Sequence, residues 1–62
     1  MNSRKVIQAL QKDGWELVRT KGSHHHFKHP TKTGVATVAH PSKDIPIATL
    51  KRIEKQSGVK LN

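Results

Sequence analysis

Apolar residues recur at helical spacing near both ends of the chain. In the N-terminal segment, three of them fall on one face of a helix: Val6, Ile7 and Leu10. Asn2 or Ser3 can cap the start of this helix, and Gly14 can take the left-handed conformation that ends one. The pattern predicts an amphipathic helix over residues 3–13.

The C-terminal segment has the same periodicity. Its apolar stripe consists of Ile47, Leu50 and Ile53, and the residues expected to face water are Lys51, Arg52 and Lys55. Pro46 suits the first turn of a helix, Asp44 lies just upstream, and Gly58 can end the helix. We expect a second amphipathic helix to begin near Pro46 and to stop at Gly58.

The segment between the two helices favours strands and turns. A first strand is indicated by four strand-forming residues: Trp15, Leu17, Val18 and Thr20. A turn at Lys21-Gly22 leads to a second strand over residues 23–29, and a turn over residues 30–34 leads to a third over residues 35–40. A β-bulge at Gly22-Ser23 is an alternative that would re-aim His24.

These elements predict one α+β domain over residues 1–62, in the order α-β-β-β-α. Short connections imply a three-stranded antiparallel sheet, and the two apolar helix stripes can both be buried on one face of it. The opposite face of the sheet is then left open to solvent. A chain of 62 residues has room for one small core but not for a deep pocket, so we expect no large cofactor.

The net charge of the chain is the strongest indication of what the protein binds. Twelve Lys and Arg residues against four Asp and Glu residues give a net charge of +8, spread along the whole chain. A field of that sign attracts polyanions, and nucleic acid is the leading candidate. The sequence has no cysteine, which excludes disulfides and thiolate metal sites, and it shows no signal peptide or membrane span. We therefore expect a cytoplasmic protein.

A run of histidines in the predicted second strand supplies the candidate chemistry. Phe27 is the large apolar residue of that strand, so it should face the helices, and alternation puts His25 and His29 on its side. His24 and His26 should then project from the open face of the sheet. A structural role suits the two inward histidines, while His40, at the end of the third strand, could serve structure or function.

Two chemical roles fit the outward pair. His24 and His26 have a spacing compatible with two metal ligands, but a third or fourth ligand is missing, no carboxylate lies nearby, and the net charge opposes a dication. General acid–base catalysis needs none of these, because histidine exchanges a proton near neutral pH. On a basic surface that holds RNA, such a base could activate the 2′-hydroxyl group. The residue pattern alone does not choose between the two histidines.

The segments "DGWELVRTKGSHHHFKHP" and "VATVAHPSKDIPIATLKRIEKQSGV" resemble the HicA toxin family of type II toxin–antitoxin modules. The resemblance spans nearly the whole chain, and "GSHHHF" is its most specific part. It implies a fold similar to the double-stranded-RNA-binding domain and a ribosome-independent mRNA interferase that a HicB-type antitoxin masks. It also implies that the catalytic residue is His24, presented by a turn at Gly22 and Ser23.

The sequence thus predicts a metal-independent endoribonuclease that cleaves mRNA with His24 as general base and needs no cofactor. His26 is a candidate for the acid or a supporting group. Expected phosphate contacts are Arg19, Lys21, Lys28 and Lys43. The alternative is a non-catalytic module that binds double-stranded RNA by shape and backbone contacts.

Overall fold

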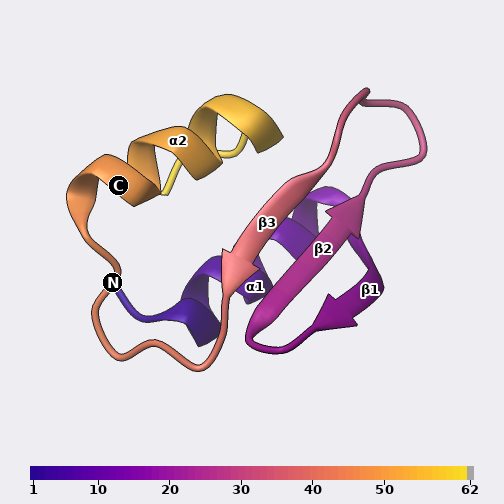
Figure 1. Cartoon of the computed structure of the whole chain (residues 1–62). Helices are drawn as coiled ribbons and strands as arrows, with labels where there is room; N and C mark the ends of the chain where they lie inside the picture. Colours follow the sequence, from indigo (N-terminus) through magenta and orange to yellow (C-terminus); the bar gives the residue numbers. More distant parts are fainter. Residues whose placement is uncertain (62) are drawn as a thin grey trace.

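The computed structural model describes residues 1–61 and has two helices and three strands. In chain order these are α1 (Ser3–Asp13), β1 (Glu16–Lys21), β2 (His24–Lys28), β3 (Ala36–Ala39) and α2 (Ile47–Ser57). The strands form one antiparallel sheet in the order β1-β2-β3 (Figure 1). The predicted α+β class and the order α-β-β-β-α are therefore confirmed.

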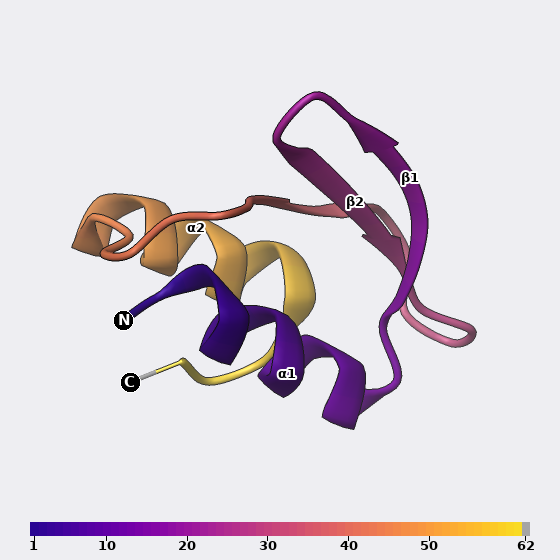
Figure 2. The same ribbon diagram turned by 90° about the horizontal axis from the view of Figure 1, so that it is seen from below.

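Both helices lie on the same side of the sheet (Figure 2). The space between them and the sheet holds one apolar core, formed by Val6, Leu10, Trp15, Phe27, Ala36, Val38, Ile45, Leu50, Ile53 and Leu61. Burial of such side chains is the main favourable term in folding. Within residues 1–61 no helix covers the other face of the sheet, which is called the open face below. No helix within residues 1–61 has the length and apolar character needed to cross a membrane.

Helix α1 has the predicted bounds because both of its ends are capped. The Asn2 side chain accepts a hydrogen bond of 2.9 Å from the backbone N–H of Lys5. At the other end Gly14 has φ +110°, and a Cβ atom there would lie 2.9 Å from Nε2 of His29. Glycine is therefore required at position 14 for two reasons. The backbone is left-handed there, and the end of β2 approaches α1 too closely for a Cβ atom.

Strands β2 and β3 are shorter than predicted, and β1, shifted by one residue, is the least buried of the three. It begins after Trp15, which belongs to the core, and it includes Lys21, so the hairpin turn consists of Gly22 and Ser23 instead of Lys21 and Gly22. All six residues of β1 are exposed, and the strand lies at the side of the sheet away from the helices (Figure 2).

The predicted apolar stripe of α2 is wrong at Ile47. This side chain is 66% exposed, whereas Ile45, in the loop before the helix, is only 5% exposed. The backbone N–H of Ile45 donates to the carbonyl of Met1 at 2.9 Å, which ties the loop to the N-terminus and turns Ile45 into the core. Pro46 is the N-cap residue of α2, not part of its first turn, and Ile47 starts the helix on the outer side.

Candidate active site

The open face of the sheet carries the side chains that the sequence predicted for it. Phe27 is 1% exposed and faces the helices, so its neighbours in β2, His26 and Lys28, lie on the opposite face together with His24. In the pairing with β3, His24 lies opposite Ala39 and His26 lies opposite Thr37. His24 is exposed, while His26 is half-buried, and its Nδ1 lies 3.0 Å from Oγ1 of Thr37.

A β-bulge in β1 brings Arg19 onto the same face. Leu17 pairs with Phe27, but Arg19 pairs with His26, and the register shifts between these two pairs. Without the shift, Arg19 would share the face of Leu17 and Phe27, because side chains alternate with period two. Directly opposed residues share a face, so Arg19 lies beside His26.

Lys21 and Lys28 are two further cations of the open face. Lys21 pairs with His24, and Lys28, two residues beyond His26 in β2, pairs with Glu16. Three of the four predicted phosphate contacts, Arg19, Lys21 and Lys28, thus lie on the face of His24. Two of them are directly opposite the outward histidines.

The turn before His24 is held from two sides. Gly22 has φ +58°, in the left-handed region that favours glycine. The carbonyl of Ser23 accepts a 2.8 Å hydrogen bond from the backbone N–H of His40, and Nδ1 of His25 lies 3.3 Å from the same oxygen. The turn therefore presents His24 in a fixed direction. The bulge considered at Gly22-Ser23 occurs in β1 instead.

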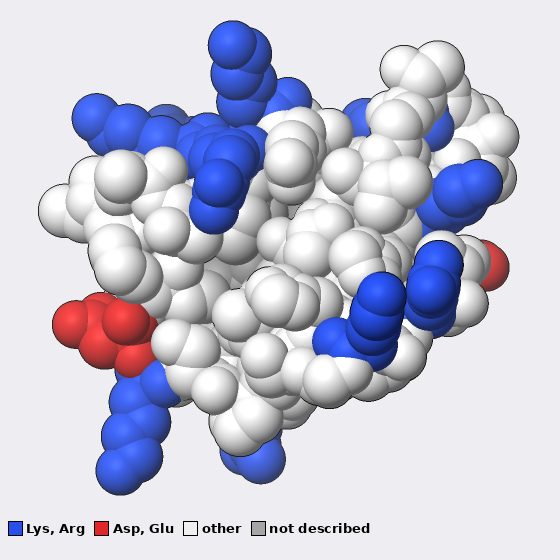
Figure 3. Space-filling view, in the orientation of Figure 1, with Lys and Arg blue, Asp and Glu red and all other residues white. Residues whose placement is uncertain are grey.

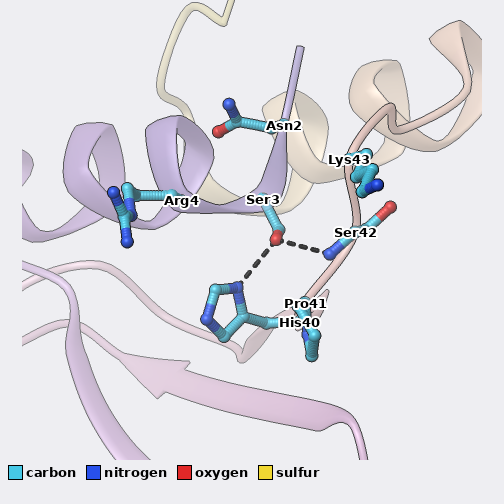
Figure 4. Close-up of a pocket in the computed structure, with 7 residues that line it drawn as sticks. All are labelled: Asn2, Ser3, Arg4, His40, Pro41, Ser42 and Lys43. Carbon is cyan, nitrogen blue, oxygen red and sulfur yellow. Dashed lines mark hydrogen bonds between the residues drawn. The ribbon is translucent and has the colours of Figure 1, made fainter.

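His40 ties this turn to the start of α1 (Figure 4). Its Nδ1 lies 2.7 Å from Oγ of Ser3, and this hydroxyl accepts a 2.8 Å hydrogen bond from the backbone N–H of Ser42. Ser3 is almost fully buried, so its hydroxyl group contacts these two partners and little solvent. Lys43, the fourth predicted phosphate contact, lines a hollow of about 420 Å³ beside these residues and not the hollow that His24 lines.

The two inward histidines have structural partners. The ring of His25 packs edge-on against His40, with 5.1 Å between the ring centroids. His29 donates from Nε2 to the carbonyl of Asp13 at 2.8 Å, and its Nδ1 accepts from the backbone N–H groups of Thr31 and Lys32 at 3.1 Å. His29 therefore fixes the loop after β2 to the end of α1.

A second hollow, of about 310 Å³, lies between the open face and α2. Its six lining residues are His24, Thr37, Ala39, Thr49, Arg52 and Gln56. The backbone N–H of Thr37 donates to Oε1 of Gln56 at 3.4 Å, so α2 lies along the outer edge of β3. None of the three α2 residues was predicted from the sequence as part of the site. Arg52 is exposed, as predicted, but helical periodicity does not show which sheet edge a helix follows.

Positive charge predominates around the open face, although Glu16 lies opposite Lys28 on it. In the view of Figure 3, Lys and Arg side chains gather over α2 and over the β1 side of the sheet, around an uncharged centre. Away from this face, Lys32 donates a hydrogen bond of 2.6 Å to Oδ2 of Asp13. That contact holds the pKa of Asp13 below its usual value, and it takes up one of the four acidic residues.

This arrangement suits proton transfer next to a bound phosphodiester. An exposed imidazole can take a proton from a hydroxyl group, and neighbouring cations can hold the phosphate in place. Within residues 1–61, no three His, Asp or Glu side chains lie close enough together to hold a metal ion.

Comparisons with known proteins agree on one relationship. Residues 3–59 match the family model described as "HicA toxin of bacterial toxin-antitoxin". A solved structure described as a "HicA3 and HicB3 toxin-antitoxin complex" contains a similar chain, with a TM-score of 0.78, 29% sequence identity and 100% of each chain covered. No curated protein gives a significant sequence match.

Proposed function

Because the chain belongs to the HicA toxin family of bacterial toxin–antitoxin systems, we propose that it is a metal-independent endoribonuclease that cleaves mRNA. The observation that carries this proposal is the position of His24. Its imidazole is exposed on the open face of the sheet, directly after a fixed turn and opposite Lys21. A general base needs such access to its substrate, and a phosphodiester needs a neighbouring cation.

In the proposed reaction, His24 takes the proton of a ribose 2′-hydroxyl group. The 2′-oxygen then forms a bond to the adjacent phosphorus, and the bond from phosphorus to the 5′-oxygen of the next nucleotide breaks. The leaving 5′-oxygen receives a proton from water or from His26, whose Nδ1 is close to Oγ1 of Thr37. The products carry a 2′,3′-cyclic phosphate and a 5′-hydroxyl group. A single imidazole acting as general base accelerates cleavage by only about 10²–10⁴-fold. We therefore expect a slow enzyme.

The cations of the open face bind the RNA backbone in this proposal. Arg19, Lys21 and Lys28 flank the two outward histidines on β1 and β2. Lys43 lies at the end of the sheet near α1. In this proposal it contacts a phosphate of the RNA that is farther from the scissile bond. Such contacts are independent of sequence and weaken as salt increases.

We further propose that a HicB-type antitoxin neutralises the toxin. The similar solved chain is part of a toxin–antitoxin complex, which supports this type of partner. The toxin acts in the cytoplasm, where it arrests translation by cleaving mRNA until the antitoxin binds.

Digestion of an end-labelled RNA, with and without EDTA, tests the proposal. We expect cleavage that EDTA does not affect and products with cyclic phosphate and 5′-hydroxyl ends. Products with 3′-hydroxyl ends, or loss of cleavage in EDTA, would overturn the mechanism. Binding of duplex RNA without any cleavage would favour the alternative, a non-catalytic RNA-binding module.

A further inference from the structure

Helix α2 forms one wall of the hollow that His24 lines, and Arg52 is its charged residue. We propose that Arg52 binds the scissile phosphate from the side opposite the β1 cations and stabilises the charge that develops on it. This inference rests on the proposed function and adds to it, since it assigns part of the active site to the C-terminal helix.

The composition of the hollow leads to Arg52. Among the six residues within 1–61 that line it, Arg52 is the only one with a permanent charge, and none is a carboxylate. The other residues that α2 contributes are Thr49 and Gln56, which lie three residues before and four residues after Arg52 and so share its side of the helix. Because His24 lines the same hollow, a phosphate bound there lies within reach of both side chains.

The wall is held in place by a contact to the sheet. Gln56 accepts the hydrogen bond of the Thr37 N–H at the free edge of β3, and Thr37 in turn contacts His26 through its hydroxyl group. Two buried side chains of α2, Leu50 and Ile53, anchor the helix in the core on its other side. Arg52 therefore extends from a rigid helix and not from a loop, which favours a defined position relative to His24.

The chemistry of the reaction explains why an arginine suits this place. As the 2′-oxygen attacks, negative charge grows on the two non-bridging phosphate oxygens. A guanidinium group can donate two parallel hydrogen bonds to such a pair of oxygens, whereas a lysine acts as a single point charge. Interactions that strengthen in the transition state raise the rate of the chemical step and not only the affinity.

The test compares Arg52→Gln with Lys51→Gln. Both variants remove one positive charge from the exposed side of α2, but Lys51 does not line the hollow. Cleavage of a labelled RNA is measured under single-turnover conditions at saturating protein, with Arg52→Lys and His24→Ala alongside. RNA affinity is measured in the His24→Ala background, and thermal unfolding checks that each variant folds.

We expect Arg52→Gln to slow the chemical step by roughly 10²-fold, the loss seen when one transition-state donor is removed. Lys51→Gln should stay within about twofold of wild type, because a charge outside the hollow affects mainly salt-dependent affinity. Arg52→Lys should recover only part of the rate.

Two outcomes would overturn the inference, and they differ in what they leave standing. Equal rates for Arg52→Gln and Lys51→Gln, with His24→Ala inactive, would remove Arg52 from the site and leave the proposed function intact. Full activity of His24→Ala would contradict the proposed function itself, and the assignment of Arg52 with it.

Discussion

Arg19 lies opposite His26 across β1 and β2, on the open face of the sheet. It does so only because the register shifts after Leu17, which pairs with Phe27. The shift turns a cation that strict alternation assigns to the helix side toward the candidate active site. The bulge thereby concentrates positive charge beside the outward histidines.

This geometry predicts that Arg19 and Lys21 each contribute a phosphate contact. In a His24→Ala background that does not cleave, Arg19→Gln and Lys21→Gln should each reduce the salt dependence of binding to single-stranded RNA. The slope of log K against log salt should fall by about 0.7 for each lost contact. Lys5→Gln is the matched control, because Lys5 lies on α1, behind the sheet. An equal change in slope for Lys5→Gln would show that only net charge matters.

The turn at Gly22 gives a second prediction. With φ +58° and no atom within 4 Å of a Cβ placed there, a substitution meets backbone strain but no clash. Gly22→Val should lower the free energy of unfolding by about 1–2 kcal/mol and slow cleavage, because the turn presents His24. Gly22→Asn should stay close to wild type, since asparagine tolerates this conformation. Chemical denaturation and RNA cleavage measure both effects, and equal behaviour of the two variants would rule out the conformational explanation.

His29 and His24 should respond in opposite ways to the same substitution. His29→Ala removes the partner of the Asp13 carbonyl and of the Thr31 and Lys32 N–H groups, so it should cost about 1–3 kcal/mol of stability. The cleavage rate per folded molecule should stay near that of wild type. His24→Ala should leave stability almost unchanged, because His24 is exposed. Denaturation curves and rates measured on one set of samples check this, and a stable His29→Ala variant with lost activity would contradict it.

Asp13 gives a pH-dependent prediction. Its pKa is lowered chiefly by the hydrogen bond from Lys32, so the folded state favours the charged carboxylate. The resulting stabilisation is present above the unfolded pKa of about 3.9 and is lost as pH falls through the lower folded value. Asp13→Asn should therefore reduce the melting temperature at pH 7, and the difference from wild type should shrink as pH falls below the unfolded pKa. A difference that is constant from pH 3 to pH 7 would exclude the ion pair as its cause.

The sequence was sufficient for those features that depend on local pattern. Capping residues and helical periodicity predicted the bounds of α1, and the position of Phe27 predicted which histidines face outward. Such patterns are strong because an amphipathic face must be buried.

Features that depend on tertiary contacts were not predictable in this way. Ile45 replaces Ile47 in the core because the loop before α2 is bonded to Met1. Arg52 lines the same hollow as His24 because α2 follows the edge of β3. The bulge that turns Arg19 toward the open face cannot be recognised from the residue types of β1. Each depends on how elements pack together, which periodicity within one element does not encode.

The central claim is that His24 acts as the general base of RNA cleavage, and one measurement tests it most directly. The single-turnover cleavage rate of His24→Ala is compared with that of wild type at saturating protein, with RNA affinity and thermal unfolding measured on the same samples. We predict a rate at least about 10²-fold lower, with affinity and melting temperature close to wild type. Cleavage by the folded variant at the wild-type rate would contradict the claim.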